Sequence, residues 1–267
     1  MGIKLGAFGK LKNYPDMDRA EYDYAELDSV EIAQLSEERF EKAKEMLSDG
    51  GLKTLVFARA LPYDEPIFHG NDFLWDKFQK FVEKSCRRMQ MLHAEKWILG
   101  NGKARSMPEY NRKYAEEQFL KLMRILCETA QKYGITVLLE PLGPRYSNYI
   151  NTIEEAVDIC KILKADNLFT MCDLRHMVDS HDNFSNIIKY GKYIRHVHID
   201  NPLLYPQRIY PEQEDGYDYS EYFRALQKID YDGTLTVEAD IPQNYLDSCL
   251  SMKSFLSAYG VLTESDR

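Results

Sequence analysis

The sequence predicts an α/β protein: a single (β/α)8 barrel, in which eight parallel strands are enclosed by a ring of helices. Short apolar runs rich in β-branched residues alternate with longer amphipathic segments along the whole chain, as expected for parallel strands with helical crossovers. The length of 267 residues suits such a barrel, which typically needs about 200–250 residues. No linker, low-complexity tract or internal repeat divides the chain, so we expect one domain over residues 1–267.

Eight candidate strands can be placed from these apolar runs. They are Ile3–Phe8, Tyr22–Leu27, Leu52–Ala58, Lys96–Leu99, Thr136–Leu139, Leu168–Cys172, Ile194–Ile199 and Thr234–Val237. An open doubly wound sheet usually has a glycine-rich turn after its first strand. The segment Gly6-Ala7-Phe8-Gly9 has no third glycine and no helix cap behind it, which favours a closed barrel.

Capping residues mark the boundaries of several helices between these strands. Ser36 is typical of an N-cap, Gly50 follows the end of that helix, and Gly134 follows a helical pattern over Tyr110–Tyr133. The other predicted helices run from Asp72 to about Leu92, or begin near Asn151, Asn183, Tyr219 and Asn244. The segment Leu11–Glu21 is polar and contains a proline, so we do not expect a full helix after the first strand.

Composition excludes several classes of protein. There are 34 Lys and Arg residues against 43 Asp and Glu residues, giving a net charge of −9, which disfavours binding to nucleic acid. The five cysteines are an odd number without Cys-x-x-Cys spacing, which indicates buried thiols in a reducing compartment. We see no signal peptide and no apolar stretch of about 18 residues. We therefore expect a cytoplasmic protein that does not bind membranes.

Four consecutive strands of the predicted barrel end in side chains that can bind metal ions. Glu140, Asp173, His198 and Glu238 lie at or next to the carboxyl ends of strands five, six, seven and eight. In a parallel barrel these ends open at one face, which is where active sites lie. Alternation along each strand turns all four side chains inward. We therefore expect the four side chains to meet at the mouth of the barrel.

Each of these residues alone could be a helix cap, an ion-pair partner or a structural histidine, and we assign no role to His69, His93 or His181. Together, three carboxylates at one point would repel each other unless a cation or protons compensated. One divalent metal ion would do so. Three oxygen ligands and one imidazole suit Mn²⁺ best, with Mg²⁺, Co²⁺ or Zn²⁺ as alternatives.

Motifs in the second half of the chain have a recognisable spacing. They are Leu-Glu140-Pro, Asp173-Leu-Arg-His176, His196-Val-His198-Ile-Asp200 and Val-Glu238. In this spacing the chain resembles the xylose-isomerase-like TIM barrels, which include sugar-phosphate isomerases and epimerases, ketose 3-epimerases, inosose dehydratases and the apurinic endonuclease branch. The resemblance implies that Glu140, Asp173, His198 and Glu238 bind one divalent metal ion. It also implies that His176 contacts the substrate.

The implied activity is metal-dependent isomerisation or epimerisation of a sugar or sugar phosphate. A proton next to a carbonyl would be removed and returned through a metal-stabilised enediolate, with Glu140 and Glu238 as the acid–base pair. Arg208, in the loop after strand seven, is expected to bind substrate hydroxyls or a phosphate, and Arg105 is a second candidate for a phosphate contact. His196 lies deeper in the barrel and is expected to be structural.

The same residues bear on other functions that this scaffold supports. An inosose-type dehydratase would share the first step, so the sequence does not separate a lyase from an isomerase. The endonuclease branch needs further histidines, but none follows His198. A metal-free sugar-binding protein would be expected to have lost a ligand. Ketose 3-epimerases usually carry another glutamate where this chain has Pro144-Arg145-Tyr146, so the substrate stays open. The sequence also leaves the oligomeric state open, and a homo-oligomer is one of the alternatives.

Overall fold

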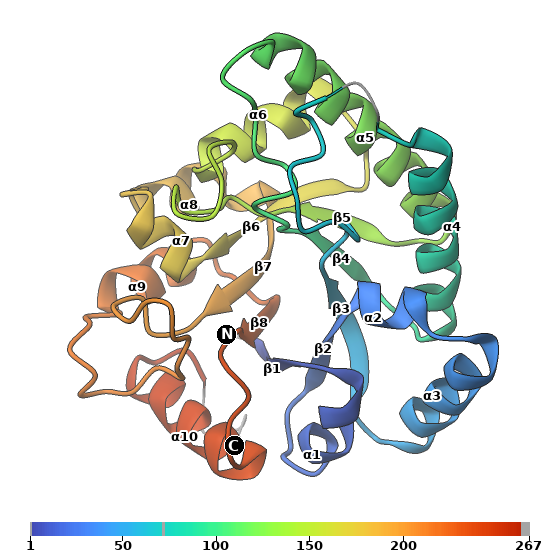
Figure 1. Ribbon diagram of the computed structural model, residues 1–267. Helices are drawn as coiled ribbons and strands as arrows, with labels where there is room; N and C mark the ends of the chain where they lie inside the picture. Colours follow the sequence, from blue (N-terminus) through green and yellow to red (C-terminus); the bar gives the residue numbers. More distant parts are fainter. Residues whose placement is uncertain (1, 71–72, 263–267) are drawn as a thin grey trace.

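The structure is a computed structural model that describes residues 2–70 and 73–262, and it confirms the predicted (β/α)8 TIM barrel. Eight parallel strands pair in chain order, and β1 closes the barrel against β8, with Ala7 opposite Val237 (Figure 1). The strands are β1 Lys4–Gly9, β2 Tyr24–Asp28, β3 Lys53–Ala58, β4 Lys96–Leu99, β5 Thr136–Leu139, β6 Leu168–Asp173, β7 Ile194–Ile199 and β8 Thr234–Val237.

The bounds of β4, β5, β7 and β8 agree with the prediction, and the other strands differ from it by one or two residues. Strand β2, for example, begins at Tyr24 rather than at Tyr22. Just before it, Asp23 contacts Leu5 of β1 twice: its carboxylate accepts a hydrogen bond from the Leu5 amide at 2.6 Å, and its amide donates to the Leu5 carbonyl at 2.8 Å. At the other end, β6 extends through Asp173, which brings this residue into the sheet.

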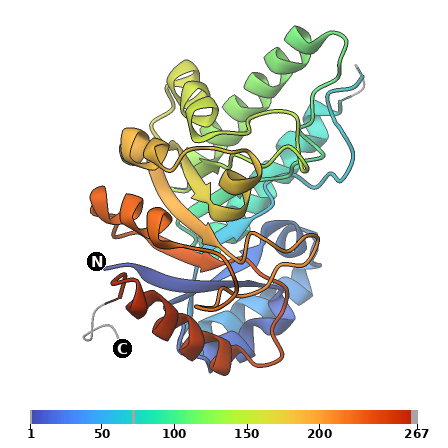
Figure 2. The ribbon, with the colours of Figure 1, turned by 90° about the vertical axis from the view of Figure 1, so that its left-hand side faces the viewer.

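Helices surround the barrel as an outer ring (Figures 1 and 2). They are α1 Tyr14–Asp18, α2 Ser29–Gln34, α3 Glu37–Asp49, α4 Trp75–Met91, α5 Arg112–Lys132, α6 Ile153–Leu163, α7 Leu174–Asp179, α8 Ser185–Tyr190, α9 Ser220–Lys228 and α10 Tyr245–Ala258. Ser36 caps α3 as predicted, by accepting a hydrogen bond from the amide of Arg39. The predicted start of α4 at Asp72 lies outside the described residues. Within the described ranges, every helix is too short or too polar to span a membrane.

Three short helices mark where local sequence was least informative. Helix α1 has only five residues and follows a 3-10 turn at Leu11–Asn13, in agreement with the expected lack of a full helix. Helices α2 and α7 were not predicted. Each begins directly at a strand end, where the carboxylate of Asp28 or Asp173 accepts hydrogen bonds from the first turn. These two helices therefore sit at the mouth of the barrel.

The barrel interior holds an apolar cluster that is separate from the core between the strands and the helix ring. Its members are Tyr24, Leu55, Val56, Ile98, Leu138 and Met171. Val137, Leu139 and Cys172 pack in the outer core instead, so the predicted alternation on strands five and six is confirmed. Because Leu138 and Met171 point inward, Glu140 and Asp173 continue along the same inward face. The five cysteines are free and buried.

Candidate active site

The four side chains selected from the sequence meet at the carboxyl end of the barrel. Each offers one ligand atom, and these atoms all lie within 4.8 Å of one another. Nδ1 of His198 on β7 is 3.1 Å from Oε2 of Glu238, which follows β8. The same atom is 3.5 Å from Oε1 of Glu140 after β5 and 3.6 Å from Oδ2 of Asp173 at the end of β6. The cluster thus surrounds one point from four neighbouring strands.

The hydrogen bonding of these atoms fits a cation at that point. Oε1 of Glu140 and Nδ1 of His198 are buried and have no hydrogen-bond partner among the described residues, which is a costly state for buried polar atoms. Three carboxylate oxygens and one imidazole nitrogen suit a divalent cation that keeps open positions for substrate. Gly100 makes room for this arrangement, because a Cβ there would lie 2.2 Å from Oε2 of Glu140.

Asp173 has two functions in this geometry. Its Oδ1 accepts a hydrogen bond from the amide of His176 at 3.0 Å and so caps α7, while Oδ2 faces the cluster. Burial alone would raise the pKa of Asp173, but the charges of His176, Arg208 and His198 hold it well below its ordinary value of 3.8. The carboxylate is therefore ionised at neutral pH and available to a cation.

Arg208 lies inside the cluster rather than at its rim. Its guanidinium contacts Oε2 of Glu238 at 2.7 Å, Oδ2 of Asp173 at 3.2 Å and Oδ2 of Asp200 at 2.9 Å. Burial raises the pKa of Glu238, but Arg208 and His198 lower it more, so that it lies below the ordinary 4.5. Arg208 thus supplies positive charge to the carboxylates, an arrangement that the sequence analysis did not foresee.

Arg175 anchors the loop that carries Arg208. Its Nε donates to Oδ2 of Asp200 at 2.7 Å. The remaining nitrogens donate to the backbone oxygens of Asn201, Leu204 and Gln207 at 2.6–3.0 Å. The sequence analysis assigned no role to Arg175 or Asp200, although both lie within the quoted motifs. Together they tie α7 to the segment after β7 and hold that segment over the site.

A cavity of about 400 Å³ opens above the cluster. It is lined by Glu140, His176, His198, Arg208 and Glu238, which are five of the six residues predicted for the site. Nε2 of His176 lies 3.9 Å from Oε1 of Glu140, and the ring packs edge-on against Tyr146, which also lines the cavity. The volume is within the range of small-molecule sites.

Arg105, predicted as a second candidate for a phosphate contact, lies away from the cavity. It is fully buried, and its guanidinium donates to the backbone oxygens of Leu99 at 3.4 Å and Ile150 at 3.1 Å. Because its nitrogens face backbone oxygens inside the protein, the proposed phosphate contact of Arg105 is wrong, and its role is to connect the end of β4 to the loop before α6.

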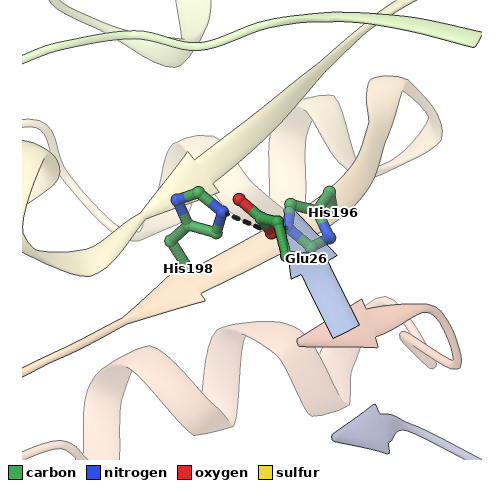
Figure 3. A group of neighbouring side chains, drawn as sticks. All are labelled: Glu26, His196 and His198. Carbon is green, nitrogen blue, oxygen red and sulfur yellow. Dashed lines mark hydrogen bonds and ion pairs between the residues drawn. The ribbon is translucent and has the colours of Figure 1, made fainter. Parts of the chain in front are cut away.

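Glu26 on β2 is a residue that the sequence analysis missed. Figure 3 shows its carboxylate between the rings of His196 and His198, and its Oε2 lies 3.1 Å from Nε2 of each. Burial lowers the pKa of His196 to about 4, although Glu26 opposes this. The available signal was a charge in the middle of a predicted strand, between Ala25 and Leu27 and on the same face as Tyr24.

The chain is similar to known proteins in sequence and in fold. A ketose 3-epimerase from Arthrobacter globiformis is 30% identical over 121 residues, which cover 43% of this chain and 38% of that protein. The match therefore spans about two fifths of the relative's own length. A D-allulose 3-epimerase from Methylomonas sp., solved with D-allulose, is 18% identical, covers 96% of this chain and 97% of its own, and has a TM-score of 0.80.

A further solved structure, of the IOLI protein with a bound zinc atom, is 17% identical, with a TM-score of 0.76 over 98% of this chain and 100% of that one. At these identities the two structures support the fold alone. The family model described as the xylose isomerase-like TIM barrel matches residues 16–255. That match spans most of the barrel, including all four side chains of the cluster. The chain belongs to the xylose isomerase-like TIM barrel family.

Proposed function

We propose that this protein is an isomerase or epimerase of a sugar or sugar phosphate that depends on one divalent metal ion. The observation that carries the proposal is the convergence of Glu140, Asp173, His198 and Glu238, whose ligand atoms lie within 4.8 Å of one another beneath a cavity of about 400 Å³. The match to a ketose 3-epimerase and the zinc atom in the IOLI structure support it. An oxygen-rich ligand set favours Mn²⁺.

The chemistry follows from the placement of the two glutamates. A cation held by the cluster would supply Lewis-acid stabilisation of the negative charge that develops when a proton leaves the carbon next to a carbonyl. Glu140 and Glu238 follow β5 and β8, which lie on either side of β6 and β7. One carboxylate can therefore accept a proton from one face of the substrate while the other delivers a proton to the opposite face. Their roles exchange with reaction direction.

His176 and Arg208 are the residues proposed to bind substrate. Both line the cavity, where His176 can hydrogen-bond a substrate oxygen. Arg208 can donate to a hydroxyl or phosphate oxygen once its contacts with Asp173 and Glu238 are given up. Charge compensation of these carboxylates by a cation would favour that exchange, so Arg208 is proposed to turn toward substrate only in the loaded protein.

Metal content tests the site directly. Asp173→Asn removes one charge but keeps the shape, so we expect metal occupancy and activity to fall together. Asp158→Asn on α6, an exposed carboxylate paired with Lys161, is the matched control and should change neither. Elemental analysis of the purified variants measures occupancy. Full metal content in Asp173→Asn would contradict the proposed ligand set. A chelator should remove the metal without unfolding, because the core is remote from the site.

Product analysis tests the reaction. Ketoses, ketose phosphates and inososes are incubated with the Mn²⁺-loaded protein in deuterated water and followed by NMR and mass spectrometry. Epimerisation or isomerisation should conserve the mass of the substrate apart from deuterium gained at the carbon next to the carbonyl. Loss of one water molecule would instead identify an inosose-type dehydratase, which shares the first proton transfer.

A further inference from the structure

The structure contains a second group of buried polar side chains, below the proposed metal ligands. Glu26 on β2 reaches the two histidines of β7 across the barrel interior, from a position 172 residues earlier than His198 (Figure 3). Its side chain is fully buried, and so are those of both histidines. Three donors converge on its Oε2: Nε2 of His196 and of His198, both at 3.1 Å, and Oγ1 of Thr236 at 2.7 Å.

The direction of each hydrogen bond in this group can be assigned from the groups at its ends. Nζ of Lys96 donates to Oγ1 of Thr234 at 2.7 Å, so the Thr234 hydroxyl is free to donate to Nδ1 of His196 at 2.7 Å. The hydrogen of His196 is then on Nε2 and is donated to Glu26. The Glu26 carboxylate, which only accepts, thus determines the tautomer of His196, and the contact between Lys96 and Thr234 is compatible with it.

His198 is oriented in the same way but has a free nitrogen at the site. An ionised carboxylate only accepts hydrogen bonds, so Nε2 of His198 carries the hydrogen that Glu26 accepts. A histidine that binds a metal ion is neutral and has a single N–H. Its lone pair is therefore on Nδ1, the atom 3.1 Å from Oε2 of Glu238 and 3.5 Å from Oε1 of Glu140.

The alternative that Glu26, His196 and His198 hold a second metal ion agrees less well with these contacts. Their ligand atoms also lie within 4.8 Å of one another. However, His198 would then ligate through Nε2 as well as Nδ1, which requires loss of both ring hydrogens. In addition, Thr236 approaches the same oxygen of Glu26 at 2.7 Å, as a hydroxyl donor does. The group is a hydrogen-bonded network.

Resting on the function proposed above, we infer that Glu26 is a positioning residue for the metal site. It holds the Nε2–H of His198 so that Nδ1 of the same ring faces the three carboxylates of the cluster. A carboxylate in this position fixes the tautomer and the rotation of a ligating imidazole and makes it a stronger ligand. Substitution of such a partner typically weakens metal binding by about 10–100-fold.

The first measurement uses the unmodified full chain with ¹⁵N-labelled histidine, loaded with Zn²⁺ or Mg²⁺ because both are diamagnetic. We expect the nitrogen chemical shifts of His198 to show the hydrogen on Nε2 and none on Nδ1. A hydrogen on Nδ1, or coordination through Nε2, would overturn the inference. This result does not depend on whether a variant folds.

The second measurement titrates Mn²⁺ into metal-free Glu26→Gln, which keeps the shape of the side chain but removes its charge. We expect affinity to fall about 10–100-fold. Tyr24→Phe is the matched control, because it removes a buried hydroxyl that contacts Thr236 at 2.6 Å but leaves the bond between Glu26 and His198. Its affinity should equal that of the unmodified protein. Equal affinity in Glu26→Gln would overturn this inference alone, whereas no Mn²⁺ binding by the unmodified protein would overturn the proposed function and this inference with it.

Discussion

The two sides of the barrel interior differ in chemistry. Strands β3 to β6 contribute an apolar side, made of Leu55, Val56, Ile98, Leu138 and Met171. Strands β2, β7 and β8 contribute a hydrogen-bonded side, made of Glu26, His196, Thr234 and Thr236. A fully buried aliphatic side chain stabilises a fold by about 1.5–3 kcal/mol, whereas a buried hydrogen bond contributes about 0.5–1.5 kcal/mol net.

This difference indicates that the two sides of the barrel interior have different roles. The apolar side contributes mainly to stability and is insensitive to the direction of individual groups. Each hydrogen bond of the polar side contributes less stability than a buried aliphatic side chain, but these bonds determine which nitrogen of His198 faces the cluster. Substitutions on the apolar side should therefore change the free energy of unfolding, whereas substitutions on the polar side should change metal affinity and turnover.

The largest effect is expected at the mouth, where the polar side ends. Glu140→Gln and Glu238→Gln each keep an oxygen that can ligate metal but cannot accept a proton, so turnover should fall about 10²–10⁴-fold. The two variants should also differ in which epimer still exchanges its hydrogen with deuterated water. Stopped assays measure turnover, and NMR measures the exchange of the hydrogen with deuterated water. Near-normal turnover in Glu238→Gln would show that this residue is a ligand only, and the two-carboxylate mechanism would be wrong.

Arg208→Gln should separate charge compensation from substrate binding. Removing the guanidinium takes one cation away from the buried charge of Asp173 and the partly buried charge of Glu238, which should cost the metal-free protein about 3 kcal/mol of unfolding free energy, the lower end for a buried pair. Mn²⁺ should restore part of this loss, because a cation compensates the same carboxylates. Urea unfolding with and without Mn²⁺ measures the difference. An equal loss in both conditions would argue against a cation at this point.

Leu138→Ala tests the apolar side. Leu138 is fully buried in the interior cluster, so the substitution should lower the unfolding free energy by about 2–5 kcal/mol. The affinity for Mn²⁺ should not change in the folded variant. Leu250→Ala on α10, where the side chain is 50% exposed, is the control and should have little effect on stability. A large loss of Mn²⁺ affinity in Leu138→Ala would contradict the proposed division between the two sides.

The smallest effect is expected at Lys96 on β4, whose ammonium group reaches across the barrel to Thr234 of the polar side. Burial lowers its pKa from 10.5 to about 8. Between these values the unfolded chain binds more protons than the folded one, so this group's contribution to stability rises with pH from about 8 to 10.5. Below about pH 8 the cost of burying its charge is fully present. The stability of Lys96→Met relative to the unmodified protein should therefore be greatest at neutral pH and decrease through this window. Urea unfolding measures this difference in stability. A difference that does not vary with pH would contradict the lowered pKa of Lys96.

Local sequence was sufficient for most strands and for the convergence of the four candidate ligands. Strand periodicity depends on neighbouring residues, and in a parallel barrel every strand ends at the same face, so Glu140, Asp173, His198 and Glu238 could be placed together before any contact was known. The short helices α2 and α7 escaped prediction because six residues are too few to show a helical period.

The sequence by itself determined the barrel fold, which side chains of the strands point inward, and the location of the candidate site. Only the tertiary structure decided that Glu26 contacts His198, that Arg208 lies among the carboxylates and that Arg105 is buried against backbone oxygens. These contacts depend on the closure of β8 onto β1 and on the path of the loop after β7. Both are set by packing between residues distant in the chain, which no local period encodes.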